Sequence, residues 1–343
     1  NHLGNWKNGE LGDFVTLKRG FDLPQQKRED GQVPIFSSSG ITGTHSTAMV
    51  KAPGVITGRY GTIGEVFYAA KDFWPLNTTL FVEDFHGNDA KFIYYFLKTL
   101  EWSKFTSASA VPGINRNTVH KEIVSLPDIE TQRRIASTLS MFDEKIKINT
   151  EINDNLQQQA QAIYSSIDNP DPAWSHGHLS DLITVKYGKD HKKLADGIYP
   201  VYGSGGIMRY VERPLYNKES VLIPRKGTLN NVMYVNQPFW SVDTMFYTEM
   251  KLPNVAKFVY HFVKAKDLAS MNAGSAVPSM TTDILNAMEV VIPSASALEE
   301  FESLVAPMYE AMEANDVQSK ALSQMRDTLL PKLMSGEIDV SDI

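Results

Sequence analysis

The sequence predicts a mixed α/β protein built by internal duplication, with two compact domains joined by two long antiparallel helices that form a coiled coil. Three observations predict this class. Motifs recur at a nearly constant offset along the 343 residues. Short β-branched and aromatic runs, bounded by glycine-rich turns, lie beside segments of helical spacing inside each copy. Each copy also ends in a long stretch whose apolar residues repeat every seven positions.

The duplication can be followed motif by motif. The first copy opens at Trp6 and the second at Trp174, 168 positions later. From Pro34 onward the offset is 166. The matching strings are Pro34–Ile41 and Pro200–Ile207, Val55–Thr62 and Val221–Thr228, and Ala90–Tyr94 and Ala256–Tyr260. An offset held over more than 100 residues indicates two copies of one unit.

Within each copy, local pattern predicts both strands and helices. Val55–Thr57, Val66–Tyr68 and Val221–Ile223 are predicted strands, and Ala90–Thr99 and Ala256–Ala265 are predicted helices. The predicted organisation is a compact domain at 1–128, a long helix at 129–170, a second compact domain at 171–293, and a second long helix with a C-terminal tail at 294–343.

The two long helices are predicted to pair with each other. Asp128 is expected to cap the first, and Ser296 with Glu299 to form a capping box at the second. Helices this rich in Gln, Asn and Glu need a partner for their apolar seams. The first seam is Ile135, Leu139, Phe142, Ile146, Asn149, Asn153, Leu156, Ala160, Ile163 and Ile167, and the second is Phe301, Val305, Met308, Met312, Asn315, Ser319, Leu322, Arg326, Leu329 and Leu333.

The order of the segments is cyclic. The first helix is followed by the copy that opens at Trp174, and the equivalent of that opening, Trp6, lies at the N-terminus, while the last helix lies at the C-terminus. An antiparallel pair with one domain at each end satisfies this order and has a pseudo-two-fold axis. Asn149 lies at the middle of the first helix and Asn315 is its equivalent. We hypothesise that the two asparagines face each other near the axis and fix the register. The alternative is that both point to solvent.

Several classes of function are excluded by what the sequence lacks. Zero cysteines rule out thiol catalysis, disulfides and cysteine-based metal sites. No phosphate-binding loop, dinucleotide turn, nucleophile elbow or paired-histidine metal motif occurs. We therefore expect a non-catalytic protein with no bound cofactor and no metal. No apolar run is long enough to cross a bilayer, and a cytoplasmic location is expected.

The net charge of −7 argues at first sight against a polyanionic partner, but the charge is unevenly distributed. Counting Lys and Arg against Asp and Glu gives a net of zero for residues 1–128 and +3 for 176–293. The helical segments 129–175 and 294–343 carry −3 and −7. The compact domains are thus neutral to mildly basic, which permits DNA there, although ordinary solvated helix faces explain the same pattern.

Polar turn clusters recur at equivalent places in both copies and are the candidate DNA-binding residues. Arginine can bridge guanine O6 and N7, while Asn, Ser and Thr can contact adenine or phosphate. The same residue types are also ordinary turn formers. The candidates are Ser37, Ser38, Ser39, Arg59, Tyr60, Thr62, Asn77 and Thr78 in the first copy, and Tyr202, Ser204, Arg225, Lys226, Thr228, Asp243 and Thr244 in the second.

With these motifs in place, the chain resembles a specificity subunit of a type I restriction-modification system. The resemblance covers nearly the whole chain. It lies in the domain–helix–domain–helix duplication, in the W-x-x-G-x-L-x-D openings at Trp6 and Trp174, and in the Pro127-to-Gln132 start of the first helix. The closing string Leu329–Ile338 is its most specific motif. The second helix departs from the pattern, because Leu298 stands where the first has Gln132.

The resemblance implies a function for each part. Each compact domain would be a target-recognition domain for one half of a split, asymmetric site in double-stranded DNA. The paired helices would set the gap between the half-sites and dock two modification subunits. Those partners would carry the S-adenosylmethionine site and methylate adenine N6, and a motor-nuclease restriction subunit can join them.

Two other classes of function stay open on the residues alone. One is a two-headed binding module for another ligand, such as a carbohydrate, on a coiled-coil spacer. The other is an enzyme whose site lies between the copies. Salt-dependent binding of duplex DNA would separate the DNA-binding protein from the first alternative, and tight binding of S-adenosylmethionine by the chain alone would favour the second.

Overall fold

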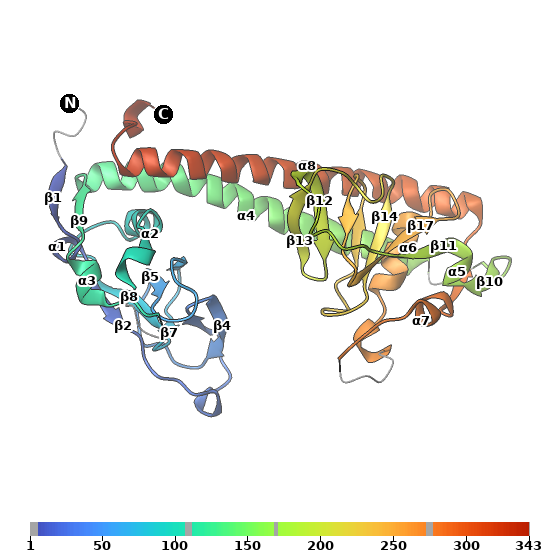
Figure 1. Ribbon diagram of the computed structural model, residues 1–343, viewed down its shortest axis with the longest axis horizontal. Helices are drawn as coiled ribbons and strands as arrows, with labels where there is room; N and C mark the ends of the chain where they lie inside the picture. Colours follow the sequence, from blue (N-terminus) through green and yellow to red (C-terminus); the bar gives the residue numbers. More distant parts are fainter. Residues whose placement is uncertain (1–5, 107–111, 168–170, 272–276, 343) are drawn as a thin grey trace. The chain divides into compact units, whose positions relative to one another are not determined.

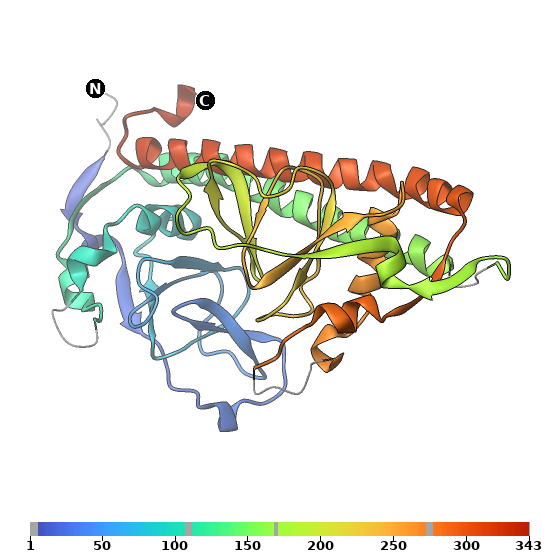
Figure 2. The ribbon, with the colours of Figure 1, turned by 45° about the vertical axis from the view of Figure 1, so that its right-hand side comes forward.

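The structure is a computed structural model that describes residues 6–106, 112–167, 171–271 and 277–342. Its contacts divide the chain into two compact units. Unit 1 contains residues 1–149 and 316–343, and unit 2 contains residues 150–315. Each unit therefore combines one compact domain with a part of both long helices, α4 (Ile129–Ser166) and α8 (Ala295–Met334). Figures 1 and 2 show the chain from two directions.

Unit 1 contains three small sheets. A four-stranded antiparallel sheet has the order β2-β8-β5-β6, a three-stranded sheet has the order β4-β3-β7, and β1 pairs with β9. The strands are β1 (Lys7–Glu10), β2 (Thr16–Arg19), β3 (Val33–Ser37), β4 (Gly40–His45), β5 (Gly54–Gly58), β6 (Val66–Ala69), β7 (Trp74–Pro75), β8 (Thr79–Asp84) and β9 (Ile123–Leu126). The short helices are α1 (Leu11–Phe14), η1 (Gln25–Lys27), α2 (Ala90–Lys98), η2 (Trp102–Phe105) and α3 (Arg116–His120).

Unit 2 repeats this topology strand for strand. Its sheets have the orders β11-β17-β14-β15, β13-β12-β16 and β10-β18. The strands are β10 (Ser175–His178), β11 (Ile183–Tyr187), β12 (Asp196–Gly203), β13 (Gly206–Val211), β14 (Ser220–Pro224), β15 (Met233–Val235), β16 (Trp240–Ser241), β17 (Met245–Met250) and β18 (Glu289–Ile292). The short helices are α5 (Leu179–Leu182), α6 (Ala256–Lys264), η3 (Leu268–Met271) and α7 (Thr282–Asn286), and η4 (Val340–Asp342) follows α8 in unit 1. The predicted duplication, strands and helices are confirmed.

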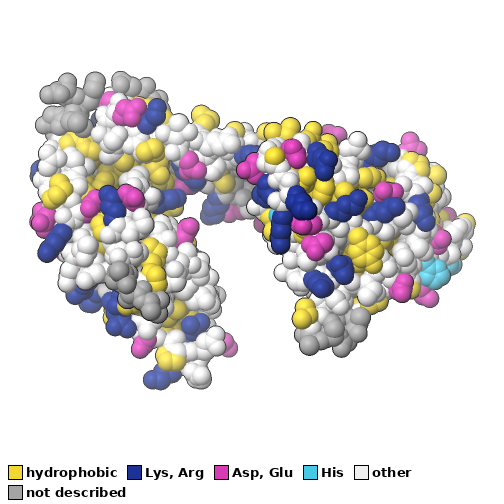
Figure 3. Space-filling model, in the orientation of Figure 1, with side chains coloured by type: hydrophobic (Ala, Val, Ile, Leu, Met, Phe, Trp, Pro, Cys, Tyr) yellow, Lys and Arg dark blue, Asp and Glu magenta, His cyan; other side chains and the backbone are white. Residues whose placement is uncertain are grey.

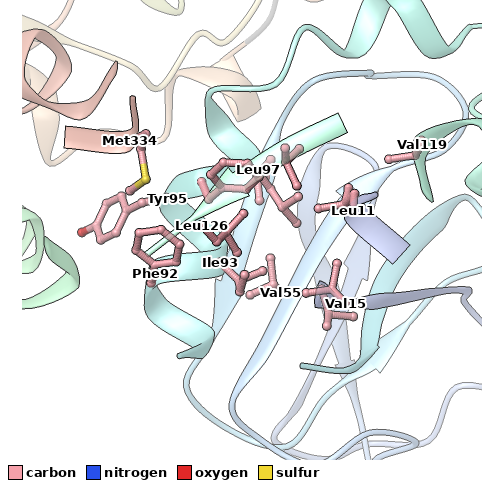
Figure 4. Close-up of a cluster of buried hydrophobic side chains, with 14 of the residues drawn as sticks. Leu11, Val15, Val55, Phe92, Ile93, Tyr95, Leu97, Val119, Leu126 and Met334 are labelled. Carbon is pink, nitrogen blue, oxygen red and sulfur yellow. The ribbon is translucent and has the colours of Figure 1, made fainter. Parts of the chain in front are cut away.

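The core of unit 1 lies between the four-stranded sheet, α2 and the two long helices. Figure 4 shows side chains of the sheet and of α2, such as Val55 and Phe92, with Met334 of α8 beside Tyr95. Leu333 and Met334 are buried in this cluster together with Ile135 of α4. The last turns of the C-terminal helix therefore complete the core of the N-terminal domain.

The predicted seams are the inward faces of α4 and α8. None of the twenty seam positions is exposed, because the seven-residue repeat keeps them on one side of each helix. In unit 1, Asp143 pairs with Arg326 and Asn149 with Ser319. In unit 2, Asn153 pairs with Asn315. In unit 1 the partner numbers fall along α8 as they rise along α4, so the two helices are antiparallel there.

The start of α4 is capped as predicted, and the start of α8 differs from the prediction. The Asp128 carboxylate accepts hydrogen bonds from the backbone N–H groups of Glu130 and Thr131, and these bonds hold its pKa below the usual value. At α8 the capping side chain is Ser294, whose Oγ accepts from the N–H of Ala297 at 3.2 Å. Ser296, the predicted cap, lies inside the helix. Ser294 follows Pro293 and stands at offset 166 from Asp128, so the repeat contained the correct signal.

Gln132 explains why the first helix begins with a polar residue at a buried position. Its Oε1 accepts from the N–H of Asp89 at 3.0 Å, and its Nε2 donates to the Asn88 side chain and to the Pro127 carbonyl. The side chain thus ties the start of α4 to the start of α2. The equivalent residue of unit 2, Leu298, is buried in the apolar core.

Candidate nucleic-acid interface

Three loops of unit 1 meet at one end of its sheets, and they hold the residues that the sequence singled out. They are the β3–β4 turn, the β5–β6 loop and the β7–β8 turn. The backbone N–H of Arg59 donates to the Thr78 carbonyl at 2.8 Å, which joins the second and third loops. The Arg59 guanidinium also lies 3.5 Å from the Asn77 carbonyl through Nη1. The side chain is thereby positioned by the turn that follows β7.

Glycines bring the β3–β4 turn against the arginine loop. A Cβ at Gly58 would lie 1.9 Å from the Thr62 carbonyl oxygen and 3.0 Å from the Cβ of Ser38. Gly61 has a φ of 80°, and a Cβ there would lie 3.0 Å from the Ser38 Oγ. A side chain at Gly58 would collide with the Thr62 backbone in this local geometry, and the positive φ of Gly61 favours glycine there.

Unit 2 builds the same cluster from its own residues. The N–H of Arg225 donates to the Thr244 carbonyl at 2.9 Å, and its Nη1 donates to the Asp243 carbonyl at 3.0 Å. Gly227 has a φ of 83°, and a Cβ there would lie 2.5 Å from the Ser204 Oγ. The arginine therefore occupies the same structural position in both copies.

A fourth segment, which sequence reasoning missed, completes each cluster. The N–H of Ile114 donates to the Arg59 carbonyl at 2.9 Å, and the N–H of Met280 donates to the Arg225 carbonyl at 2.9 Å. These segments precede α3 and α7. A sequence signal precedes them, because Ala110-Val111-Pro112 is repeated as Ala276-Val277-Pro278. Of these residues, Ala110, Val111 and Ala276 lie outside the described residues.

The two clusters differ in what surrounds the arginine. The Arg59 guanidinium lies 4.5 Å from the Tyr60 ring centre, and its Nη2 is 3.3 Å from the Tyr60 hydroxyl. Tyr60 is replaced by Lys226 in unit 2, where Arg225 lies 5.4 Å from the ring of Tyr187. One copy thus presents an arginine on an aromatic ring, and the other adds a second cation beside it.

None of the fifteen candidate residues is fully buried, and a third of them are exposed. The exposed ones are Ser39, Thr62, Lys226, Thr228 and Asp243. Those that are half-buried are Ser37, Ser38, Arg59, Tyr60, Asn77, Thr78, Tyr202, Ser204, Arg225 and Thr244. The Asn77 amide donates to the Asp22 carboxylate, so this side chain is held in place.

The charges of unit 2 fit an anionic ligand. Figure 3 shows Lys and Arg side chains gathered over its visible face, with fewer acidic side chains among them. The exposed basic residues of unit 2 include Lys192, Lys193, Arg213 and Lys226. Within the described ranges, no group of three or more His, Asp or Glu side chains could hold a metal ion, and no helix is long and apolar enough to cross a membrane.

Each of the two central asparagines contacts the opposite helix inside its own unit. The Asn149 amide donates to Gln318 at 2.9 Å and to Ser319 at 3.1 Å. The Asn315 amide donates to Asn153 at 2.8 Å. In the repeat, Asn149 corresponds to Asn315 and Asn153 to Ser319. The Asn149–Ser319 contact of unit 1 is therefore equivalent to the Asn315–Asn153 contact of unit 2. That Asn149 and Asn315 face each other stays a prediction, because they belong to different units.

Known proteins resemble the chain along most of its length. A family model described as the type I restriction modification DNA specificity domain matches residues 4–158 and 173–301. The MjaIX specificity subunit of Methanocaldococcus jannaschii is 23% identical over 75% of this chain and 71% of its own. The HindI specificity subunit of Haemophilus influenzae is 21% identical over 70% and 75%. The crystal structure of a type I S subunit from M. genitalium matches with a TM-score of 0.63 at 20% identity, covering 96% of both chains.

One family match lies in each copy of the repeat, and together they include both arginine clusters. The chain therefore belongs to the family of DNA specificity subunits of type I restriction-modification systems, whose task is to recognise a DNA sequence for catalytic partner subunits.

Proposed function

We propose that the chain recognises a bipartite, asymmetric site in double-stranded DNA, with one half-site contacted by each arginine cluster. The domain bodies at 1–128 and 171–293 would bind DNA, and the helical segments at 129–170 and 294–343 would carry the partner subunits. The observation that carries this proposal is the presence of equivalent loop clusters around Arg59 and Arg225 with unlike neighbouring side chains. Equivalent scaffolds with unlike surfaces suit two unlike half-sites.

The geometry of the arginines supports contact with guanine. In unit 2, Nη1 of Arg225 is anchored on the Asp243 carbonyl, which orients the guanidinium plane. Arginine binds guanine O6 and N7 through two parallel hydrogen bonds, and an oriented plane loses less entropy on binding. The nearby serine, threonine and asparagine side chains would contact adenine or phosphate.

The DNA contact can be tested on the full chain assembled with its modification subunits. Fluorescence anisotropy on labelled duplexes should show site-specific binding that weakens as salt rises. Arg225→Ala should weaken binding to the specific site by about 1–3 kcal/mol, roughly 5- to 150-fold. Arg225→Lys should not restore it, because lysine cannot make the two parallel bonds. Arg213→Ala removes the same charge from an exposed position and should lower affinity for all sequences alike. Absence of any sequence-specific binding would contradict the proposal.

The long helices are proposed to dock two modification subunits, and a restriction subunit can join that complex. Seven large apolar side chains are exposed on them: Ile129, Met141, Ile148 and Ile152 on α4, and Leu304, Val317 and Met325 on α8. Ile148 and Ile152 lie one turn apart on α4, and neighbouring exposed apolar side chains are typical of protein contacts. The excess of acidic residues on the helical segments is also unsuited to DNA. S-adenosylmethionine would be bound by those partners, and the complex would work in the cytoplasm.

The partner site can be tested with a substitution that the repeat itself tolerates. Val317 stands at offset 166 from Glu151, which is an exposed residue of α4. Val317→Glu should therefore leave folding unchanged and reduce the binding of one modification subunit. Native mass measurement of the assembled complex counts the subunits. A complex that retains both subunits at equal affinity would contradict the assignment of this surface.

The carbohydrate-binding alternative has no support in the family assignment.

A further inference from the structure

Ile41 and Ile207 occupy the same place in the two copies, one residue beyond the turn of a hairpin. Each follows a glycine of positive φ, Gly40 at 105° and Gly206 at 108°. Gly40 pairs with Ser37 and Gly206 with Gly203, so each hairpin is closed by a two-residue turn. Ile41 is 64% exposed and Ile207 is 48% exposed.

Single exposed apolar side chains are common on protein surfaces. The informative observation is that both copies expose one at the same position. Where the structure describes both copies, this is the one pair of equivalent positions at which both expose a large apolar side chain. Elsewhere the counterpart is usually polar or small. Met208 corresponds to Thr42, and Ile123 corresponds to Glu289. The two copies differ at most surface positions and yet keep isoleucine here.

The surroundings hold each isoleucine in a defined place. Ile41 lies directly across the hairpin from Phe36, and Ile207 lies across from Tyr202. Cross-strand pairs of aromatic and β-branched residues restrict side-chain motion. Both isoleucines are on the edge strands β4 and β13. The hairpin tips touch the arginine loops through Ser38 at Gly61 and Ser204 at Gly227.

A two-stranded ribbon can enter the major groove, where the 5-methyl group of thymine is the one apolar feature of the base edges. We infer that Ile41 and Ile207 are specificity-determining residues that each contact a thymine methyl group in their own half-site. The inference rests on the proposed function, because it requires that the arginine clusters contact DNA. Each isoleucine would add to its half-site an apolar contact that the polar side chains of the arginine cluster cannot make.

The experiment replaces thymine by deoxyuridine, which removes the methyl group and leaves all hydrogen bonds and charges in place. The site is first defined by selection from a random duplex library with the full chain and its modification subunits. Duplexes then carry deoxyuridine in one half-site at a time. Removing a buried methyl group should weaken binding about fourfold or more. Ile41→Ala and Ile207→Ala should each weaken binding similarly and abolish the deoxyuridine effect in one half-site only.

Two matched controls separate this contact from general surface effects. Ile123 in unit 1 is 72% exposed and Ile198 in unit 2 is 78% exposed. Ile123→Ala and Ile198→Ala should keep the full sensitivity to deoxyuridine.

The outcomes distinguish the inference from the proposed function. If no specific site emerges from the selection, the proposed function fails. If a specific site emerges but deoxyuridine has no effect in either half-site, or if the effect persists in both alanine variants, the assignment of the isoleucines is overturned and the proposed function stands.

Discussion

His261 is a buried histidine at the junction between the compact domain of unit 2 and its helices. Its Nδ1 lies 2.7 Å from Gln161 of α4 and its Nε2 lies 2.8 Å from the Tyr309 hydroxyl of α8. The ring is fully buried, and burial lowers its pKa to about 4. Both ring nitrogens therefore have hydrogen-bond partners within the core.

This pKa predicts an acid-sensitive unit 2. An unfolded histidine titrates near pH 6.5, so the folded state binds fewer protons than the unfolded state below that pH. The buried, neutral His261 therefore contributes about 3 kcal/mol to the free energy of unfolding above about pH 6.5. This contribution is lost as the pH falls toward 4. Urea unfolding of wild type and His261→Gln at pH 7.5 and pH 5 measures it. The variant should be less stable at pH 7.5 and should lose less stability between the two values; equal losses would contradict the assignment.

At the scale of elements, each compact domain is attached to the helix pair by a different polar network. In unit 1, the Asp143 carboxylate accepts from Tyr95 of α2 and from Arg326 of α8, the latter at 2.5 Å. Asp143 corresponds to Tyr309, and Tyr95 corresponds to His261. At these equivalent positions the contact is therefore charged in unit 1 and neutral in unit 2, where the ion pair between α6 and α8 is instead formed by Lys257 and Glu302.

Removing the charge at the unit 1 junction should destabilise that unit alone. In Asp143→Asn the side-chain NH2 group, itself a donor, would face one of the two donors, and Arg326 would keep only Asp327 as a carboxylate partner. We expect a loss of about 1–3 kcal/mol, because both partners are largely shielded from water. Hydrogen exchange of β5 and β8, compared with β14 and β17, should show the loss only in unit 1. Asp154→Asn, an exposed change on the same helix, is the control and should fall within about 0.5 kcal/mol of wild type.

The elements were predictable to the extent that they repeat. The fixed offset, the seven-residue seams and the turn residues locate the sheets, the helices and both arginine clusters, because each depends on local pattern. The junction networks were not predictable, since Tyr95, Asp143 and Arg326 are far apart in sequence and share no period. Hydrogen-bond partners across such distances depend on tertiary packing.

At the scale of the whole molecule, the chain closes on itself, because the C-terminal helix completes the N-terminal domain. Leu333 is fully buried in the core of unit 1 together with residues of α2 and β5. Its equivalent by the repeat, Ile167, packs against the core of unit 2. The motif near the C-terminus, Leu329–Ile338, therefore has a structural role at the opposite end of the sequence.

A substitution near the C-terminus should accordingly destabilise the first domain. Leu333→Ala should cost about 2–5 kcal/mol and increase hydrogen exchange in β2, β5 and β8. Ile167→Ala should increase exchange in β11, β14 and β17 instead, and by less, because that side chain is only half-buried. Exchange that rises equally in both units for either variant would show that the units do not fold as the contacts indicate.

The central claim is that two equivalent clusters contact two unlike half-sites. Sequencing of methylated adenines in DNA from cells carrying the complete system, with either wild type or Arg225→Ala, tests it most directly. Wild type should give two half-sites at a fixed separation, and Arg225→Ala should relax the sequence in one half-site while the other half-site and the gap stay unchanged. An uninterrupted recognition sequence, or a change in both half-sites with the single substitution, would contradict the account.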